Sequence, residues 1–240
     1  MSLQFVLGSA GCGKTEYVYR QLVEAAGQNP KKNYLVVVPE QFTMQTQQKL
    51  VELAPNHAIM NIDVLSFKRL AYRVFDELGM TEVRVLEETG KNLVLRKLAQ
   101  EQEEKLTVLR PNMNRMGYVG EVKSFISELV QYNVTPQQLE AMANRNDIPS
   151  VLAAKLKDIV VMYQAFQDFM EGSYITAEEI LNVLKGVAAQ SQLLQGSVIV
   201  FDEFTGFTPI QNELLKELFL VAERILIPLT IDRREDFYHS

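Results

Sequence analysis

The sequence predicts an α/β fold in which a parallel sheet is interrupted by a large all-helical insertion. Apolar, strand-like runs alternate with helical patterns over residues 1–86 and again over residues 190–240. This alternation is typical of a parallel sheet covered by helices. In residues 87–189, the apolar positions recur at helical spacing. We therefore expect a discontinuous α/β domain (1–86 plus 190–240) and a separate helical insertion (87–189).

The first strand–helix unit contains a phosphate-binding motif. The apolar run "LQFVLG" leads into "GSAGCGKT", which matches the P-loop pattern G-x-x-x-x-G-K-[ST] at every fixed position. Glycines let the backbone turn so that successive N–H groups point at phosphate oxygens, and the following helix adds its N-terminal donors. Lys14 should reach the β- and γ-phosphates, and the Thr15 hydroxyl should ligate Mg²⁺. The expected nucleotide-binding residues are Gly8, Ser9, Ala10, Gly11, Cys12, Gly13, Lys14 and Thr15.

Two more strand–helix units follow the P-loop. "NYLVVVP" (33–39) is a continuous apolar run, typical of a strand buried on both faces of a parallel sheet. The polar helical pattern "FTMQTQQKLVEL" comes next, and "MNIDVLSF" then predicts a third strand. Ser66 stands at the N-cap position of the helix that begins "FKRLAYRVF".

The predicted insertion shows helix starts as well as helical periodicity. Thr135-Pro136 predicts an N-cap followed by proline at the first helical position. Thr176 and Glu179 have the spacing of a capping box. "LRPNMNRMG" is the most loop-like stretch of the insertion. One apolar stripe is expected to pack in a core: Leu152, Leu156, Ile159, Tyr163, Phe166 and Phe169.

The α/β pattern returns near the end of the chain. Val198–Phe201 is an apolar strand that ends in Asp202 and Glu203, and "RILIPLTI" predicts a further strand. A carboxylate at the carboxyl end of such a strand has the form of a Walker B element, in which Asp202 would hold Mg²⁺. Glu203 would orient or deprotonate an attacking water. Because ligands of open α/β sheets bind at the carboxyl ends of the strands, Asp202 and the P-loop should belong to one site.

Composition narrows the function classes. The chain has 240 residues, of which 47% are hydrophobic, and no apolar run approaches the roughly 20 residues that span a bilayer. We expect no secretory signal before the first strand. A single cysteine, Cys12, excludes a disulfide framework and suits the cytoplasm, and two histidines make a zinc site improbable. The net charge of −6 disfavours a globally basic nucleic-acid binder but leaves room for a local basic strip.

Taken in order, these motifs resemble the first RecA-like domain of UvrD-type superfamily 1 DNA helicases. The resemblance rests on the P-loop, "VLSFKRLAYRVF", the helical insertion and "VIVFDEFTGFTPIQNELLKEL". More specifically, the chain resembles the N-terminal part of the B subunit of AddAB-type helicase–nucleases. The marks of that subunit are "LVVVPEQFTMQTQQKL", "TGKNLVLRKL" and "FTPIQNELLKEL". The resemblance covers essentially the whole chain.

The resemblance implies a RecA-like P-loop NTPase domain with a 1B-like insertion, binding ATP and Mg²⁺ in DNA double-strand break repair and recombination. It implies an A-type helicase–nuclease subunit as partner and DNA as ligand, with no membrane involved. The family's nuclease domain and iron–sulfur cluster lie far towards the C-terminus of the B subunit, and nothing in this chain matches them. We therefore expect an N-terminal fragment that lacks the nuclease domain.

The resemblance also implies DNA contacts in the segments after the second and third strands. Phe67 could stack on a base, and Lys68 or Arg69 could meet phosphates. The alternative is that Phe67 completes the core of the sheet and the two charges only solvate a helix. The implied residues are Gln41, Thr43, Gln45, Ser66, Phe67, Lys68 and Arg69.

Departures from the family pattern bear on hydrolysis. Thr205 and Gly206 replace a Gln and an Asp of the family box, and Glu235 stands where motors carry a Gln that senses the γ-phosphate. The adenine-reading Gln has no counterpart, and the arginines of the second RecA-like domain lie outside the chain. We therefore expect ATP binding with little turnover. Two alternatives stay open: a vestigial nucleotide site on a scaffold that docks a partner or guides DNA, and a small P-loop kinase or GTPase.

Overall fold

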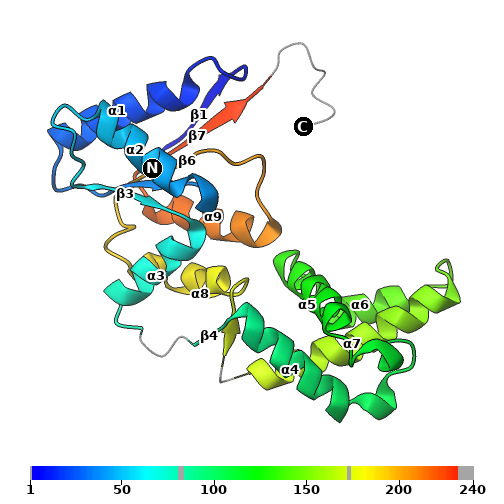
Figure 1. Ribbon diagram of the computed structural model, residues 1–240. Coiled ribbons are helices and arrows are strands. Elements are labelled where there is room, and N and C mark those ends of the chain that lie inside the picture. Colours follow the sequence, from blue (N-terminus) through cyan, green and yellow to red (C-terminus); the bar gives the residue numbers. More distant parts are fainter. Residues whose placement is uncertain (1, 81–83, 172–173, 232–240) are drawn as a thin grey trace. The chain divides into compact units, whose positions relative to one another are not determined.

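The computed structural model describes residues 2–80, 84–171 and 174–231 (Figure 1). The chain divides into two compact units. The α/β unit comprises Met1–Thr81, Leu181–Phe207 and Gln211–Ser240, and the helical unit comprises Glu82–Ile180 with Thr208–Ile210. Across the described residues, no helix combines the length and apolar content needed to cross a membrane.

A five-stranded sheet forms the centre of the α/β unit. Its strands lie in the order β1-β7-β6-β2-β3, and every neighbouring pair is parallel. This confirms the predicted α/β fold with a parallel sheet. The strands are β1 (Ser2–Gly8), β2 (Tyr34–Val37), β3 (Ile62–Leu65), β6 (Val198–Phe201) and β7 (Arg224–Thr230).

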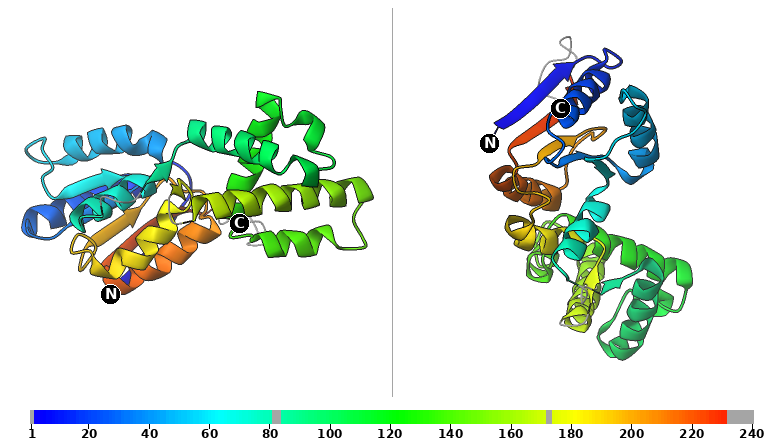
Figure 2. Two further views of the ribbon diagram at one scale, coloured as in Figure 1. Left: turned by 90° about the horizontal axis from the view of Figure 1, so that it is seen from below. Right: turned by 90° about the vertical axis from the view of Figure 1, so that its left-hand side faces the viewer.

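Helices cover both faces of this sheet. In the right-hand view of Figure 2, α1 and α2 lie on one side of the sheet, and α8 and α9 lie on the other. Ser66 begins α3 as predicted, because its hydroxyl accepts a hydrogen bond from the Arg69 N–H at 3.3 Å. The helices are α1 (Lys14–Gln28), α2 (Thr43–Leu53), α3 (Phe67–Glu77), α8 (Ile180–Val187) and α9 (Pro209–Val221), with 3₁₀ turns at Glu40–Phe42 and Ala188–Gln190.

Different apolar side chains are buried on the two faces of the sheet. On the α1/α2 face, Val36, Val200 and Leu226 pack against Tyr19 and Leu22 of α1 in one buried cluster. Because side chains alternate along a strand, the residues between them point to the opposite face. Ile199 and Phe201 are buried on that second face. Burial on both faces explains why β2 and β6 are continuously apolar.

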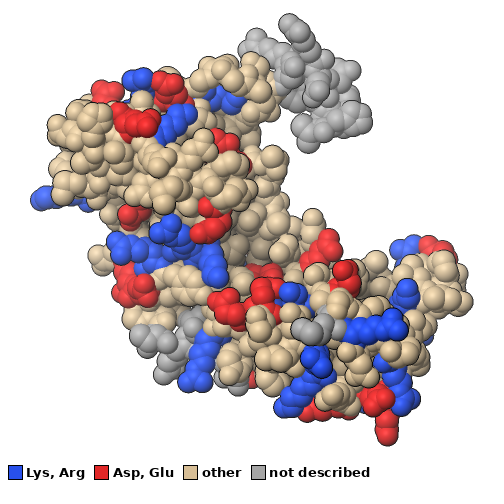
Figure 3. All heavy atoms as spheres, viewed as in Figure 1, with Lys and Arg blue, Asp and Glu red and all other residues tan. Residues whose placement is uncertain are grey.

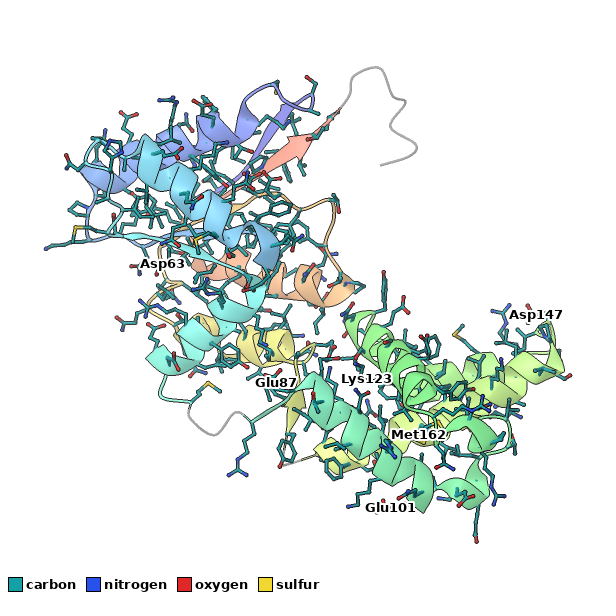
Figure 4. All side chains as sticks on the ribbon, in the orientation of Figure 1. Asp63, Glu87, Glu101, Lys123, Asp147 and Met162 are labelled. Atoms are coloured by element: carbon teal, nitrogen blue, oxygen red, sulfur yellow. The ribbon has the colours of Figure 1, made fainter. Side chains whose placement is uncertain are left out.

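The helical unit packs four helices around one core. Met162, which is fully buried, lies on α7 within this core (Figure 4). The helices are α4 (Glu88–Glu101), α5 (Met116–Gln131), α6 (Pro136–Ala143) and α7 (Ser150–Met170), with 3₁₀ turns at Glu103–Lys105 and Arg110–Asn112. The predicted N-cap at Thr135 is confirmed as part of a capping box, in which Thr135 and Gln138 exchange hydrogen bonds.

Two details of the helical region differ from the sequence-based expectation. Val85–Leu86 (β4) and Ile175–Thr176 (β5) form a small parallel pair, so the region expected to be all-helical contains a strand. Strands of two residues are too short to show periodicity. In the predicted apolar stripe, Leu152 is 44% exposed, because the core cluster reaches α7 only from Leu156 onwards.

A buried lysine ties together segments of the helical unit that are far apart in sequence. Lys91 on α4 is 1% exposed, and its Nζ lies 2.8 Å from Glu178 and 2.9 Å from Glu88. Glu88 also pairs at 2.6 Å with Lys123 on α5. Burial alone would lower the pKa of Lys91, but the hydrogen bonds to Glu178 and Glu88 outweigh it and raise that pKa. Lys91 therefore stays charged inside the unit.

A buried carboxylate anchors the chain between α4 and α5. Asp158 on α7 is 2% exposed and accepts hydrogen bonds from the backbone N–H groups of Thr107, Val108 and Leu109, with a further bond from the Thr107 hydroxyl. The segment that follows contributes Leu109 and Met113 to the core. The stretch with the most loop-like sequence is thus held firmly to α7.

Candidate nucleotide-binding site

The predicted P-loop lies between the carboxyl end of β1 and the start of α1. Gly11 and Gly13 have φ values of 72° and 86°, in the left-handed region that favours glycine. A Cβ on Gly8 would lie 2.5 Å from the Cys12 Sγ, so a larger residue there would require the exposed Cys12 side chain to move. The backbone path itself favours glycine at Gly11 and Gly13.

The start of α1 offers hydrogen-bond donors. Gly13 is the N-cap residue, and within the described residues no side chain caps the helix. The first N–H groups of a helix lack carbonyl partners inside it, and the positive end of the helix dipole lies there. This end of α1 can bind an anion.

The Lys14 side chain folds back onto the glycine-rich loop. Its Nζ donates hydrogen bonds to the backbone oxygens of Gly8 at 3.0 Å and Ser9 at 2.7 Å. The same Nζ lies 3.9 Å from the Sγ of Cys12, whose side chain is exposed. The Lys14 ammonium group thus lies next to the backbone N–H donors at the start of α1.

Asp202 follows β6, and its buried carboxylate has one oxygen without a hydrogen-bond partner among the described residues. It is 3% exposed, and its Oδ1 accepts a hydrogen bond from the Glu203 N–H at 2.9 Å. Its Oδ2 is buried and has no hydrogen-bond partner among the described residues. A buried carboxylate oxygen without a partner costs free energy, so Asp202 is a candidate ligand for a cation.

Glu203 has an unusual backbone conformation. Its φ is 64°, in the left-handed region that a residue with a Cβ rarely adopts. Such strain costs about 1–2 kcal/mol and tends to be retained at functional sites. Glu203 is also exposed, next to the buried Asp202.

One cavity joins the P-loop to these two acidic residues. It has a volume of about 640 Å³ and lies wholly within the α/β unit. Of the predicted nucleotide-binding residues, Ala10, Gly11, Gly13, Lys14 and Thr15 line it, whereas Gly8, Ser9 and Cys12 do not. The remaining lining residues are Glu16, Lys49, Asp202, Glu203, Phe204, Thr205, Pro228, Leu229 and Thr230.

The sequence did not predict two residues at or near this site. Lys49 on α2 brings a second lysine to the cavity, and its Nζ lies 5.8 Å from the centre of the Tyr19 ring. The Tyr19 hydroxyl is buried without a hydrogen-bond partner among the described residues. Burial and the nearby Asp202 carboxylate raise the pKa of Tyr19. The packing of α1 and α2 on the sheet brings Lys49 to the cavity and Tyr19 close to Asp202.

The predicted DNA-contacting residues fall into an exposed group and a structural group. Gln41, Gln45, Lys68 and Arg69 are exposed. Figure 3 shows Lys and Arg side chains gathered over α3, the helix that carries Lys68 and Arg69. In contrast, the Thr43 hydroxyl donates a hydrogen bond to Glu40 O, and Ser66, which caps α3, is buried.

Phe67 lies in an aromatic cluster. It is 7% exposed, and its ring centre lies 5.7 Å from that of Phe201, 5.4 Å from Phe204 and 6.4 Å from Phe207. A base could stack on this ring only if the ring left the cluster. The structure thus favours the alternative in which Phe67 completes the core of the sheet, with its neighbours Lys68 and Arg69 on the surface.

Comparison with known proteins extends over nearly the whole chain. The family described as "ADDB, N-terminal" matches residues 5–240. The chain is 42% identical over 235 residues to the B subunit of the ATP-dependent helicase/deoxyribonuclease of Lachnoclostridium phytofermentans, covering 98% of this chain and 20% of that protein. The B subunits of the same name from Clostridium tetani and Bacillus cereus are 36% and 34% identical, over 95% and 98% of this chain and 20% and 21% of their own.

These relatives are much longer than the chain, which spans about a fifth of their length. The matched region still runs from the middle of β1 through β7 and so includes most of both units. On the strength of this match, the chain belongs to the family of AddB N-terminal regions found in the B subunits of ATP-dependent helicase/deoxyribonucleases.

Proposed function

We propose that this chain is the ATP-binding domain of the B subunit of an AddAB-type helicase–nuclease that acts in DNA double-strand break repair and recombination. In this proposal, residues 1–86 plus 190–240 form a RecA-like P-loop NTPase domain, and residues 87–189 form a 1B-like insertion. The relatives' names state ATP dependence, helicase activity and deoxyribonuclease activity for the whole protein. The ATP-binding role belongs to this part because it carries the P-loop.

A single observation supports the proposal most strongly. The P-loop residues and the buried Asp202 line the same cavity, although 188 positions separate Lys14 from Asp202 (202 − 14 = 188). The loop supplies backbone donors and Lys14 for phosphate oxygens. Asp202 supplies a carboxylate oxygen that the protein leaves without a partner among the described residues. A triphosphate with a divalent cation satisfies both groups at once.

The residues present fit Mg²⁺ as a companion of the nucleotide. Hard oxygen donors suit this ion, and it is usually bound through one or two protein oxygens together with substrate phosphates. Thr15 and Asp202 both line the cavity and would hold it. When bound, Mg²⁺ would neutralise negative charge on the phosphates.

For hydrolysis, we propose that Glu203 orients or deprotonates water and that Lys14 stabilises the transferring phosphate. Both residues line the cavity. Glu235, in the γ-sensing position of the sequence, lies outside the described residues. The two units that the structure describes include no second RecA-like domain, whose arginines would supply about 10³–10⁵ in rate. Catalysis depends on contacts made mainly in the transition state, so their loss should lower turnover far more than affinity.

We also propose partners and a location for the full-length protein. The relatives are named as B subunits, which implies a second subunit for those proteins. We propose that the full-length protein pairs with an A-type subunit in the cytoplasm and acts on DNA. Within this chain, Gln41, Lys68 and Arg69 are the candidate DNA contacts best supported by their exposure.

Isothermal calorimetry of MgATP binding tests the site. The Lys14→Ala variant should bind MgATP at least about 10-fold more weakly, because the variant loses a charge-assisted contact. Lys31→Ala is the control, since Lys31 is exposed and does not line the cavity. Equal affinities for the Lys14 variant and the wild type would reject the site.

A phosphate-release assay tests the predicted division between binding and turnover. The isolated chain should hydrolyse ATP far more slowly than about one per second, the low end of typical enzyme turnover. Faster release, with or without single-stranded DNA, would mean that the chain is a complete enzyme. In the full-length complex, unchanged turnover of the Lys14→Ala variant would instead favour a vestigial site on a scaffold.

A further inference from the structure

A buried tyrosine beside the candidate nucleotide site has a hydroxyl that makes no hydrogen bond. Tyr19 lies on α1 and is 1% exposed, and its ring belongs to the apolar cluster between α1, α2 and the sheet. Its hydroxyl has no partner among the described residues. Buried tyrosine hydroxyls are normally paired, because an unpaired one costs free energy. A phenylalanine would fill the same space without this cost, so the hydroxyl requires an explanation.

A carboxylate with the complementary deficit lies nearby. The Tyr19 hydroxyl is close to Asp202 and also to Thr46 on α2. In the α/β unit, as far as the structure describes it, the Tyr19 hydroxyl and the Asp202 Oδ2 are the two buried side-chain atoms that lack a hydrogen-bond partner. At neutral pH a phenol keeps its proton, whereas an aspartate carboxylate is ionised. A donor without an acceptor thus lies beside an acceptor without a donor.

The surroundings of the Tyr19 ring limit what its hydroxyl can reach. The ring packs in one cluster with the fully buried Leu50 and Val200, and the Lys49 Nζ lies 5.8 Å from the centre of the ring. Interiors are close-packed, so the hydroxyl cannot turn towards solvent without disturbing this cluster. Tyr19 does not line the nucleotide cavity, whereas Asp202 does. The hydroxyl can therefore act on a bound ligand through Asp202.

We propose that Tyr19 is a positioning residue for the cation of the nucleotide site: its hydroxyl donates a hydrogen bond to Asp202 when MgATP binds and so fixes the orientation of the carboxylate towards Mg²⁺. The inference rests on the proposed function. An ionised carboxylate offers several lone pairs, so Asp202 can accept this bond and still bind a cation. Groups that hydrogen-bond to metal-binding carboxylates orient them in this way.

Calorimetry of ATP binding by Tyr19→Phe, with and without Mg²⁺, tests the proposal. The substitution removes only the hydroxyl. The factor by which Mg²⁺ increases the affinity for ATP should fall by about 10-fold or more, as for other groups that orient metal ligands. The affinity for ATP without Mg²⁺ should stay within about twofold of the wild type, because the glycine-rich loop and Lys14 are unchanged. An unchanged Mg²⁺ factor in Tyr19→Phe would overturn the proposal.

Tyr34→Phe is the matched control. Tyr34 is 2% exposed and belongs to the same cluster, but its hydroxyl donates a hydrogen bond to Ala25 O at 2.8 Å. In urea denaturation without ligand, Tyr34→Phe should lower the midpoint because it loses this bond, and it should leave the Mg²⁺ factor unchanged. Tyr19→Phe should not lower the midpoint. A lower midpoint with an intact Mg²⁺ factor would assign the Tyr19 hydroxyl to a structural bond with Thr46 and overturn the proposal.

A double variant tests whether Tyr19 acts through Asp202. If it does, Tyr19→Phe combined with Asp202→Asn should show the Mg²⁺ factor of Asp202→Asn alone, within about twofold. Losses that multiply would mean that Tyr19 acts independently of Asp202, which overturns the proposal.

Failure of the proposed function gives a different result. The wild-type chain itself would then show no Mg²⁺-dependent binding of ATP, and the role of Tyr19 would fall with the site. A wild type with a clear Mg²⁺ effect that Asp202→Asn abolishes and Tyr19→Phe keeps would overturn the role of Tyr19 alone.

Discussion

Two aspartates, one in each unit, are equally buried but differ in what surrounds them. Asp158 in the helical unit and Asp202 in the α/β unit are 2% and 3% exposed. Both oxygens of Asp158 accept hydrogen bonds from the segment that begins at Thr107. Asp202 accepts one bond, from the adjacent Glu203 N–H, and its Oδ2 has no partner among the described residues.

This difference separates a structural carboxylate from a candidate ligand-binding one. A buried charge that is fully hydrogen-bonded holds its donors in place, and its removal leaves those donors unsatisfied and destabilises the fold. A buried carboxylate with an open oxygen costs free energy in the folded protein unless a ligand binds it. The cavity beside Asp202 gives such a ligand access, whereas Asp158 lies within the helical unit's own packing.

The largest effect is expected for Asp158→Ala. The substitution leaves the N–H groups of Thr107, Val108 and Leu109 without their acceptor, and each unsatisfied buried donor costs about 1–3 kcal/mol. The free energy of unfolding of the helical unit should fall by at least about 3 kcal/mol, measured by urea denaturation. Asp168→Ala, at an exposed position on the same helix, should change it by less than about 0.5 kcal/mol. Equal losses for the two variants would contradict the structural role of Asp158.

In contrast to Asp158→Ala, Asp202→Asn should change ligand binding much more than stability. The amide keeps the size of the side chain and removes the charge, so the free energy of unfolding should change by less than about 1 kcal/mol. The factor by which Mg²⁺ increases the affinity for ATP should fall by about 10-fold or more. Removing other groups around bound metals has effects of this size. Calorimetry with ATP, with and without Mg²⁺, measures this factor. A variant that still shows the full Mg²⁺ effect would place the metal away from Asp202.

A third substitution addresses the strain beside Asp202. Glu203→Gly removes a Cβ from a residue with φ of 64°, which relieves about 1–2 kcal/mol of strain and adds about 0.5–1 kcal/mol of backbone entropy cost. The net gain in the free energy of unfolding should be about 0.5–1 kcal/mol in urea. Glu203→Gln keeps the Cβ and should show no gain. If both variants are equally stable, the strain is not real.

Sequence reasoning predicted the parts of this molecule that local patterns specify. The glycine-rich turn between β1 and α1, the strand before Asp202, the Ser66 cap and the parallel sheet each follow from motifs or periodicity over a few residues. Lys49 at the cavity and Tyr19 near Asp202 could not be found this way, because their positions depend on how α1 and α2 pack on the sheet.

The same limit applies to buried polar groups. Lys91 and Asp158 look like ordinary polar positions of amphipathic helices, yet both are buried. Their partners Glu178 and Thr107 lie 87 and 51 positions away, beyond the reach of any local pattern. Phe67 is the reverse case, since a family motif suggested a surface role and the structure buries the ring.

The smallest predicted effect concerns the ion pairs of Glu88, which are more exposed than either aspartate. Hydrogen bonds from Lys123 and then Lys91 hold the pKa of Glu88 below its ordinary value of 4.5. A carboxyl group with a lowered pKa stabilises the fold above its unfolded pKa, and this stabilisation is lost as the pH falls through the lower, folded value. The pairing should therefore contribute at pH 7 and fade below pH 4.5.

Glu88→Gln should remove this contribution. Because the Glu88 side chain is 59% exposed and screened by solvent, the loss at pH 7 should be below about 1 kcal/mol. The difference between the variant and the wild type should shrink when urea denaturation is repeated in acid, well below the ordinary pKa, and also in high salt. Glu104→Gln, at an exposed position of the same unit, serves as the control. A difference that stays constant between neutral and acid pH would mean that Glu88 stabilises the unit through packing rather than charge.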